Sequence, residues 1–275
     1  MTTDRRSLFA NSAIAHNDLR GVIEAERFGD GTLARISAPV ADLRINPDKP
    51  MLDRQVLYGH PVRLLDPKTG FCRDETSGYV GYIDPNNLAP WVEPTHRVIA
   101  RSTLLFDQPD FKRPDPIILP CGALLPITET SGKYATTSDA LFALAAHLLP
   151  MDDVQPDLAA TAANLVGTPY LWGGNSATGI DCSGLVQLAM QTAGMFCPGD
   201  SDQQRDQLGT TLPPDTTAKR NDLMFWKGHV ALVYDSDTLL HANAYHMAVA
   251  FEPIQEACAR IEAQGDGGLL AHKRL

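Results

Sequence analysis

The sequence predicts an α+β protein in which two small barrels of short strands precede a domain of helices and antiparallel strands. The first half contains short β-prone runs broken by turn residues, the region after residue 151 becomes alanine-rich, and β-prone runs return after that. A chain of 275 residues is long enough for two or three domains, each with its own core.

The first half is expected to hold a lead-in and both barrels. Residues 1–31 form the lead-in, with a short helix expected over Ser12–Arg27. Residues 32–90 contain runs such as "QVLYGHPVRLLDPKTG" and "SGYVGYIDPNNL", which predict the first barrel. Residues 91–150 again contain short β-prone runs separated by turn residues, as in "HRVIARSTLLFDQPD". This loose repeat predicts a second barrel there.

Residues 151–275 are expected to form one domain. "PDLAATAANLVG" predicts a helix from about Asp157 to Gly167, and "CSGLVQLAMQTAG" predicts a second helix that ends at Gly194. "DLMFW", "HVALVYD" and "TLLHAN" then read as strands separated by turn residues. A helix that carries a cysteine, followed by a sheet that carries histidines, can bring a thiol nucleophile and its base together.

Charge, hydropathy and cysteine content argue against several classes of partner and of fold. A net charge of -10 disfavours nucleic acid and anionic lipid as partners, and the basic cluster "AHKRL" is expected to be a solvated tail. No uncharged apolar run could span a bilayer, and polar residues interrupt the apolar stretch near the N-terminus, which favours a cytoplasmic location. An odd number of scattered cysteines argues against a disulfide framework. They are Cys72, Cys121, Cys182, Cys197 and Cys258.

Cys182 follows the glycine-rich stretch "GTPYLWGGNSATGID" and precedes an apolar run. If Asp181 and Ser183 cap the second helix, Cys182 lies at its N-terminus, where unpaired N–H groups and the helix dipole favour a thiolate. The alternative is a small buried hydrophobic residue, which is the interpretation preferred for the other cysteines.

His229 and His241 are the candidate base and its partner. A hairpin turn about Ser236 puts His229 opposite Asn243 and diagonal to His241, and a turn about Asp235 makes the two histidines direct partners. In both registers the side chains share a face, whereas a turn centred half a residue between them would put the two histidines on opposite faces. A structural role for either histidine is the ordinary alternative, and a zinc site with Cys182 is weaker because no ligand pair has metal-site spacing.

Three blocks resemble the NlpC-type cysteine peptidases, papain-like enzymes that cut bacterial cell-wall peptides: "GTPYLWGGNSATGIDCSGL", "KRNDLMFWKGHVALVYD" and "LLHAN". The resemblance covers about residues 152–275, while the first barrel is similar to bacterial SH3-like domains. In layout the chain is similar to γ-D-glutamyl-L-diamino acid dipeptidyl peptidases, which carry two such barrels before a papain-like catalytic domain.

The resemblance implies a role for individual residues. Cys182 would be the nucleophile, His229 the general base, His241 its orienting partner, and Tyr170 an oxyanion donor beside the N–H of Cys182. It also implies a substrate-binding set. Asp181 would hold the α-amine of the substrate's L-alanine, Ser183 and Ser201 would line the D-glutamate subsite, and Tyr79 of the first barrel would close the amine pocket.

Several of these roles have a plainer alternative: helix capping for Asp181, local capping for Ser183 and Ser201, and aromatic packing for the oxyanion donor Tyr170. Asn221 departs from the family, which usually has glycine there.

The resemblance implies hydrolysis of the γ-D-glutamyl–diamino acid bond in murein peptides with a free N-terminal L-alanine, during cell-wall recycling. No cofactor or metal is expected, and the oligomeric state stays open. A general peptidoglycan endopeptidase is the first alternative, and it would lack recognition of the free amine. A non-catalytic SH3-like binding protein is the second, which the intact set of Cys182, His229 and His241 disfavours.

Overall fold

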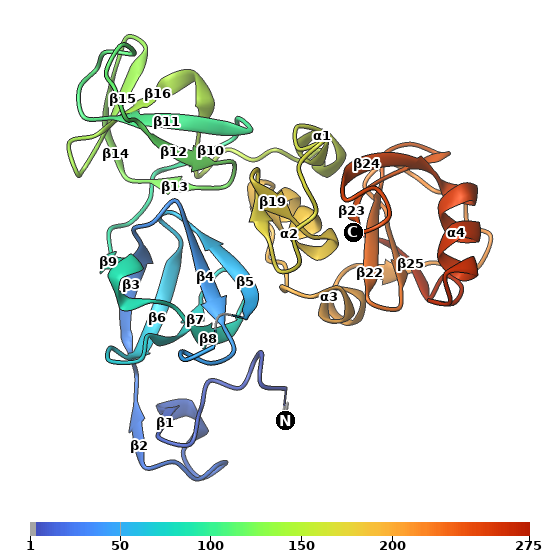
Figure 1. Cartoon of the computed structure of the whole chain (residues 1–275), viewed down its shortest axis with the longest axis horizontal. Helices are drawn as coiled ribbons and strands as arrows, with labels where there is room; N and C mark the ends of the chain where they lie inside the picture. Colours follow the sequence, from blue (N-terminus) through green and yellow to red (C-terminus); the bar gives the residue numbers. More distant parts are fainter. Residues whose placement is uncertain (1–3, 50) are drawn as a thin grey trace. The chain divides into compact units, whose positions relative to one another are not determined.

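The computed structural model describes residues 4–49 and 51–275. They form two compact units, one that runs to Val98 and includes Ser102–Met151, and one made of Ile99–Arg101 with Asp152–Leu275. The predicted mixture of helices and sheets is confirmed: the described part of the first unit is built from strands and 3-10 turns, and α1 to α4 all belong to the second (Figure 1).

The first sheet of the N-terminal unit has the strand order β5-β4-β8-β7-β6-β3-β9. Its inward side chains include Ile36, Leu43, Val62 and Tyr79, which pack into one apolar cluster. The turn η2 (Pro85–Asn87) leads into its last strand. The strands are β3 (Thr32–Ile36), β4 (Val40–Arg44), β5 (Leu52–Leu57), β6 (Pro61–Asp66), β7 (Phe71–Asp74), β8 (Val80–Tyr82) and β9 (Leu88–Pro90).

The rest of this unit forms two further sheets, with the orders β12-β11-β16-β15-β14 and β13-β10-β17. An ion pair of 2.7 Å between Arg35 and Asp139 ties them to the first sheet. Whether the two halves are separate SH3-like barrels stays a prediction. The elements are β10 (His96–Val98), β11 (Ser102–Phe106), β12 (Ile117–Pro120), β13 (Leu124–Leu125), β14 (Ile127–Ser131), β15 (Tyr134–Thr137), β16 (Phe142–Leu144), η3 (Ala145–His147) and β17 (Leu148–Pro150).

The helix expected over Ser12–Arg27 is wrong. This segment holds two short strands, which pair in parallel, and a 3-10 turn: β1 (Ile14–His16), η1 (Asn17–Leu19) and β2 (Arg27–Gly29). The side chain of Asn11 accepts hydrogen bonds from the N–H groups of Ala13 and Ile14, and Ile14 is buried with Phe9 in a cluster on the first sheet. Packing of apolar side chains against that sheet therefore overrides the local helical pattern.

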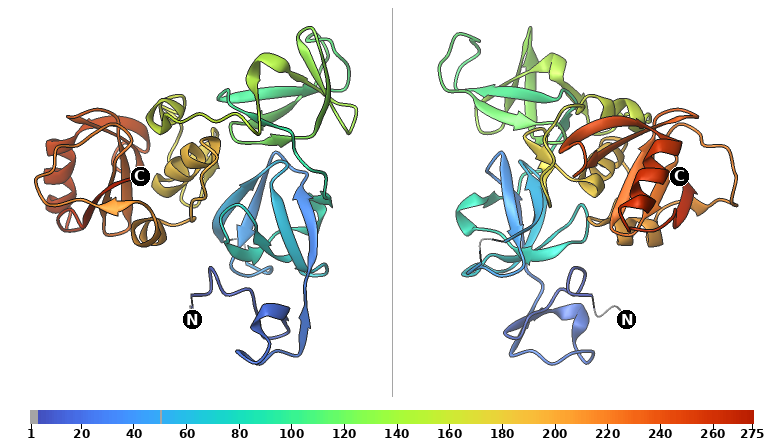
Figure 2. Two further views of the ribbon diagram at one scale, coloured as in Figure 1. Left: turned by 180° about the vertical axis from the view of Figure 1, so that it is seen from behind. Right: turned by 45° about the vertical axis from the view of Figure 1, so that its right-hand side comes forward.

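The C-terminal unit is built on a sheet with the order β20-β25-β21-β22-β23-β24. Helix α2 packs against β22 and β23, while α4 (Ile254–Ala263) packs against β23 and β24. Both views in Figure 2 show α4 lying along this sheet. The strands are β20 (Thr210–Thr211), β21 (Leu223–Trp226), β22 (His229–Val233), β23 (Thr238–Asn243), β24 (Ala248–Pro253) and β25 (Ala271–Arg274), and a separate hairpin joins β18 (Asn175–Ser176) to β19 (Gly179–Ile180).

Two helices precede the sheet, as predicted. Helix α1 (Leu158–Ala163) starts after Asp157, whose carboxylate accepts a hydrogen bond from the N–H of Ala160, and it ends before the expected Gly167. Helix α2 (Cys182–Thr192) ends two residues before Gly194, which has φ of +73° and serves as the predicted glycine stop. A third helix, α3 (Ser201–Gln207), was not expected.

The basic C-terminal cluster is also different from the prediction. Instead of a solvated tail it forms β25, which lies between β20 and β21. Lys273 is buried and donates a hydrogen bond to the carbonyl of Leu208, and His272 lies 2.8 Å from a carboxylate oxygen of Asp222. The segment pairs with β20 and β21, and the hydrogen-bond partners of Lys273 and His272 offset the cost of burying these two side chains. Among the described residues, none of the helices has the length and apolar character needed to cross a membrane.

Candidate active site

Cys182 is the first residue of α2, as the sequence predicts. Asp181 caps this helix: one carboxylate oxygen accepts hydrogen bonds from the N–H of Gly184 at 2.6 Å and from the hydroxyl of Ser183 at 3.0 Å. The helix is buried along nearly its whole length, so the position of Cys182 is set by the core as well as by the cap. A thiol at a helix N-terminus lies where backbone N–H groups stabilise negative charge.

The glycine-rich stretch before Cys182 is shaped to meet that cap. Gly173 has φ of +74° and donates its N–H to the second carboxylate oxygen of Asp181 at 2.9 Å. At Gly174 a Cβ atom would lie 2.6 Å from the carbonyl oxygen of Gly179, so any larger residue would collide with the backbone. The two glycines therefore let the chain fold back onto the start of the helix.

His229 and His241 meet on one face of the sheet. Leu232 pairs with Leu240 and Val233 with Leu239, which is the register of a turn centred on Ser236. The Nε2 atom of His229 lies 2.9 Å from Nδ1 of His241. The predicted pairing of the two rings is therefore confirmed, with the diagonal arrangement of the Ser236 register.

The sequence analysis missed two residues that continue this chain of contacts. Nε2 of His241 lies 2.9 Å from Oε2 of Glu252, which is on β24. Arg260, on α4, binds both oxygens of the Glu252 carboxylate at 2.8 Å. His241 is fully buried and Glu252 is 6% exposed, so the contacts are largely shielded from water. A hairpin about Tyr245 and His246 would have placed Glu252 diagonal to His241, but no motif marks it.

Burial decides the charge of these groups. Burial beside the His241 ring and the Arg260 charge lowers the pKa of His229 to about 3, so this imidazole is neutral and able to accept a proton. Burial also lowers the pKa of His241, against the opposing effect of Glu252. Burial raises the pKa of Glu252, but hydrogen bonds from Arg260 and His241 outweigh it and hold the pKa at about 2.

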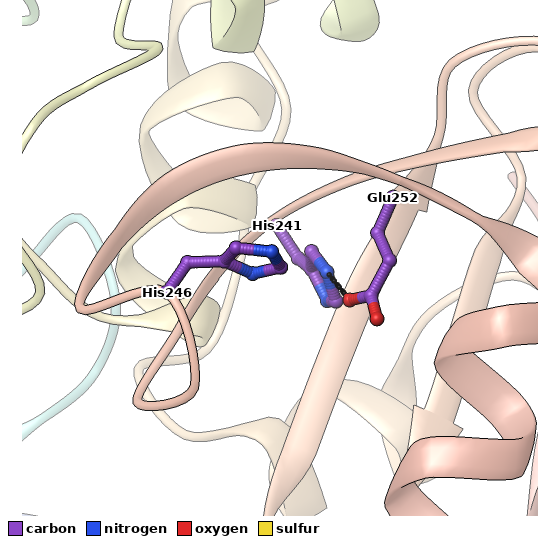
Figure 3. A group of neighbouring side chains, drawn as sticks. All are labelled: His241, His246 and Glu252. Carbon is purple, nitrogen blue, oxygen red and sulfur yellow. Dashed lines mark hydrogen bonds and ion pairs between the residues drawn. The ribbon is translucent and has the colours of Figure 1, made fainter.

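His246 lies beside this chain of contacts, from the turn between β23 and β24. Figure 3 shows His241 between His246 and Glu252, and one ligand atom from each lies within 4.8 Å of the others. Both ring nitrogens of His241 and both carboxylate oxygens of Glu252 already have hydrogen-bond partners. His246 instead contacts Asn243, whose side-chain oxygen lies 3.0 Å from its Nδ1. We therefore assign no metal to this group.

Two of the other predicted residues, Tyr170 and Ser201, lie on segments that are bonded to residues next to the start of α2. Tyr170 is half-buried and forms an isolated bridge with Ile180, directly before the Asp181 cap. Ser201 begins α3, and the buried side chain of Gln204 on that helix donates a hydrogen bond to the carbonyl of Ser183. The expected contact between the Cys182 sulfur and the His229 ring stays a prediction, as do the substrate-binding roles of these residues.

Tyr79 belongs to the other unit. It is 3% exposed and lies in the apolar cluster of the first sheet. Its predicted role in an amine pocket stays a prediction.

The unusual Asn221 has a structural reason. Its φ is +73°, a conformation that glycine adopts easily and that asparagine tolerates better than other residues. Its side chain also accepts a hydrogen bond from the N–H of Ala159 in the first turn of α1. Asparagine therefore keeps the turn that a glycine would allow and adds a link to α1.

Comparisons with known proteins agree with this geometry. Residues 167–262 match the NlpC/P60 family. Dipeptidyl-peptidase 6 of Lysinibacillus sphaericus is 26% identical over 239 residues, which is 76% of this chain and 87% of that protein. Gamma-D-glutamyl-L-lysine dipeptidyl-peptidase of Bacillus subtilis is 36% identical over 94 residues, 31% of each chain. Peptidoglycan endopeptidase RipB of Mycobacterium tuberculosis is 33% identical over 113 residues, 35% of this chain and 46% of RipB.

A solved structure extends the likeness of fold to most of the chain. An NlpC/P60 family protein from Bacillus cereus aligns with a TM-score of 0.73 at 19% identity, over 88% of this chain and 99% of the other. The residues proposed for chemistry in the C-terminal unit, from Tyr170 to His241, all fall within the family match. The chain therefore contains an NlpC/P60 domain at residues 167–262 and resembles the dipeptidyl peptidases of that type.

Proposed function

We propose that this protein is a cysteine peptidase that hydrolyses the γ-D-glutamyl–diamino acid bond of murein peptides with a free N-terminal L-alanine. The observation that carries the proposal is the pairing of His229 with His241 on strands packed against the helix that Cys182 begins, within the NlpC/P60 match. This arrangement supplies a nucleophile at a helix N-terminus, a neutral base and an orienting partner.

In the proposed reaction the Cys182 thiol gives its proton to His229, and the sulfur attacks the γ-carbonyl of D-glutamate. The N–H of Cys182 and the hydroxyl of Tyr170 stabilise the oxyanion. His229 then protonates the leaving amine of the diamino acid, which leaves a thioester on Cys182. Water hydrolyses the thioester, with His229 as the base, and releases L-Ala-D-Glu.

The preference for a free N-terminus is supported by the extent of the similarity. The resemblance to the Lysinibacillus dipeptidyl-peptidase continues through 76% of the chain, far beyond the NlpC/P60 segment. We propose that this preference also depends on the N-terminal unit, as two SH3-like barrels, and that Asp181 holds the substrate amine. We further propose a cytoplasmic role in recycling wall peptides, since the sequence favours that location.

Mass spectrometry of L-Ala-γ-D-Glu-diaminopimelate tests this function. We expect release of L-Ala-D-Glu from the free peptide, and a rate at least roughly a hundredfold lower when the L-alanine is acetylated, which corresponds to about 2.7 kcal/mol. A Cys182→Ser variant is the matched control and should release nothing. Absence of cleavage by the wild-type protein would refute the proposal.

The second candidate is a general peptidoglycan endopeptidase. It is favoured by the 33% identity to RipB, which is confined to 35% of this chain. Comparable rates on free and acetylated peptides would establish this alternative in place of the first.

A further inference from the structure

We propose that Glu252 is a positioning residue that fixes which nitrogen of His229 carries its proton, and so makes His229 able to accept the thiol proton, while Arg260 holds the Glu252 carboxylate in place. This inference rests on the proposed function, in which Cys182 is the nucleophile and His229 its base. The two rings alone do not determine which of them donates the hydrogen bond that joins them.

Two neutral imidazoles that share a hydrogen bond can be polarised in either direction. If His241 donates Nδ1–H to Nε2 of His229, then His229 carries its own proton on Nδ1. If instead His229 donates Nε2–H to Nδ1 of His241, then Nδ1 of His229 holds a lone pair. Because Nε2 of His229 is occupied by His241, only the second arrangement leaves this ring a free lone pair for the thiol.

Glu252 selects the second arrangement. Its carboxylate is ionised at neutral pH and can only accept hydrogen bonds, so His241 must donate from Nε2 across the 2.9 Å contact. A neutral His241 that is protonated on Nε2 has its lone pair on Nδ1, and it therefore accepts from His229. The direction of both hydrogen bonds therefore follows from the negative charge of Glu252, which ends this row of contacts.

Arg260 fixes the position of the Glu252 carboxylate and opposes its effect on the histidine pKa values. The guanidinium donates to both oxygens of Glu252, which keeps the carboxylate ionised and its orientation fixed. Arg260 is itself placed by a hydrogen bond to Gln264 and by the ring of Tyr245, 4.6 Å from its guanidinium carbon. Its positive charge opposes protonation of the histidines, whereas Glu252 favours it.

The proton movement in this arrangement is short. The S–H bond of Cys182 breaks, its electron pair stays on sulfur, and the proton forms a bond to Nδ1 of His229. The resulting imidazolium donates Nε2–H to His241, which keeps its own proton directed at Glu252, and no proton passes further.

The charged and titratable groups that act on the two rings come from several neighbouring elements. They are His241 on β23, which acts on His229, together with His246 in the turn, Glu252 on β24 and Arg260 on α4. Of these, Glu252 and Arg260 have opposite charges and do not belong to the proposed triad. Removing each charge separately should therefore shift the pKa values of the two histidines in opposite directions.

The experiment compares Glu252→Gln, Arg260→Gln and Glu256→Gln in the full chain, the last being a matched control with the same charge change on the exposed side of α4. Two readouts are used: nitrogen-15 NMR of the ring tautomers and pKa values of His229 and His241, and the pH midpoint of Cys182 alkylation by iodoacetamide. Neither readout depends on the substrate.

We expect Glu252→Gln to mix the histidine tautomers and to lower both the histidine pKa values and the alkylation midpoint, the latter by about one pH unit, because a negative charge is lost. Arg260→Gln should keep the tautomers and raise both the histidine pKa values and the midpoint, because a positive charge is lost. Peptide cleavage should fall roughly ten- to a hundredfold in Glu252→Gln, the range expected for loss of a charged hydrogen bond. Glu256→Gln should match the wild type in every measurement.

The outcomes separate this inference from the proposed function. A wild-type protein that cleaves no peptide, but whose tautomers and midpoints respond as described, supports the positioning role and refutes only the function. A wild-type protein that cleaves, with unchanged tautomers and midpoint in Glu252→Gln, overturns the positioning role. Shifts of the same sign in Glu252→Gln and Arg260→Gln also overturn it, since a structural disturbance has no reason to change sign. If Glu252→Gln does not fold, Arg260→Gln still gives the deciding sign.

Discussion

Replacing Asp181 with alanine tests whether this carboxylate holds the start of α2. The change removes the acceptor for the N–H groups of Gly184 and Gly173 and for the hydroxyl of Ser183. Loss of a helix cap costs about 1 kcal/mol, and loss of a hydrogen bond to a charged group costs about 1.5–3 kcal/mol. Because two backbone donors would be left buried, we expect the free energy of unfolding to fall by about 3 kcal/mol.

Asp181→Asn should cost less, about 1.5 kcal/mol, because asparagine caps helices well but keeps only one oxygen. The control is Asp157→Ala at the cap of α1, where the carboxylate is more exposed and a loss of about 1 kcal/mol is expected. The assay is urea unfolding of the full chain, followed by tryptophan fluorescence, to which the buried Trp226 contributes. If Asp181→Ala is no less stable than Asp157→Ala, the reasoning from the cap is refuted.

The same variants separate capping from substrate binding. If Asp181 also holds the substrate amine, Asp181→Asn should lose cleavage of the free peptide at a temperature where it is fully folded. If its kcat/KM on that peptide equals the wild-type value, the residue acts only as a cap.

Four further predictions follow from the site. Cys182→Ser should abolish turnover with an unchanged circular dichroism spectrum, and a variant that still turns over would exclude this residue as the nucleophile. Iodoacetamide should modify Cys182 before the more exposed Cys258, whose thiol pKa is raised by burial and by nearby carboxylates, as peptide mass spectrometry would show. Asn221→Ala should lose about 2 kcal/mol in urea unfolding, and Asn221→Gly less, because alanine strains the positive φ and both lose a hydrogen bond. The folded pKa values of His229 (about 3) and Glu252 (about 2) lie below their ordinary values, so stability falls as the pH falls: below about 6.5 because only the unfolded chain readily protonates His229, and below about 4.5 because only the unfolded chain readily protonates Glu252. Urea unfolding from pH 7 to 4 should show this loss, and His229→Gln should reduce it.

The sequence by itself determined the features that depend on neighbours along the chain. The start of α2 at Cys182 follows from a cap that spans four residues, from Asp181 to Gly184. Its end follows from a single glycine that can adopt a positive φ. The meeting of His229 and His241 follows from the length of one hairpin, because side chains on a strand alternate between faces.

The tertiary structure alone decided the features that depend on distant partners. Glu252 and Arg260 are ordinary charged residues in the sequence, and they join the histidines only because β24 pairs with β23 and α4 packs on both strands. The basic C-terminal segment forms a strand because β20 and β21 offer it backbone partners. The N-terminal segment is not helical because its apolar side chains pack against the first sheet instead. In each case the deciding free energy comes from burial and pairing with residues far away in the chain, and no local pattern encodes it.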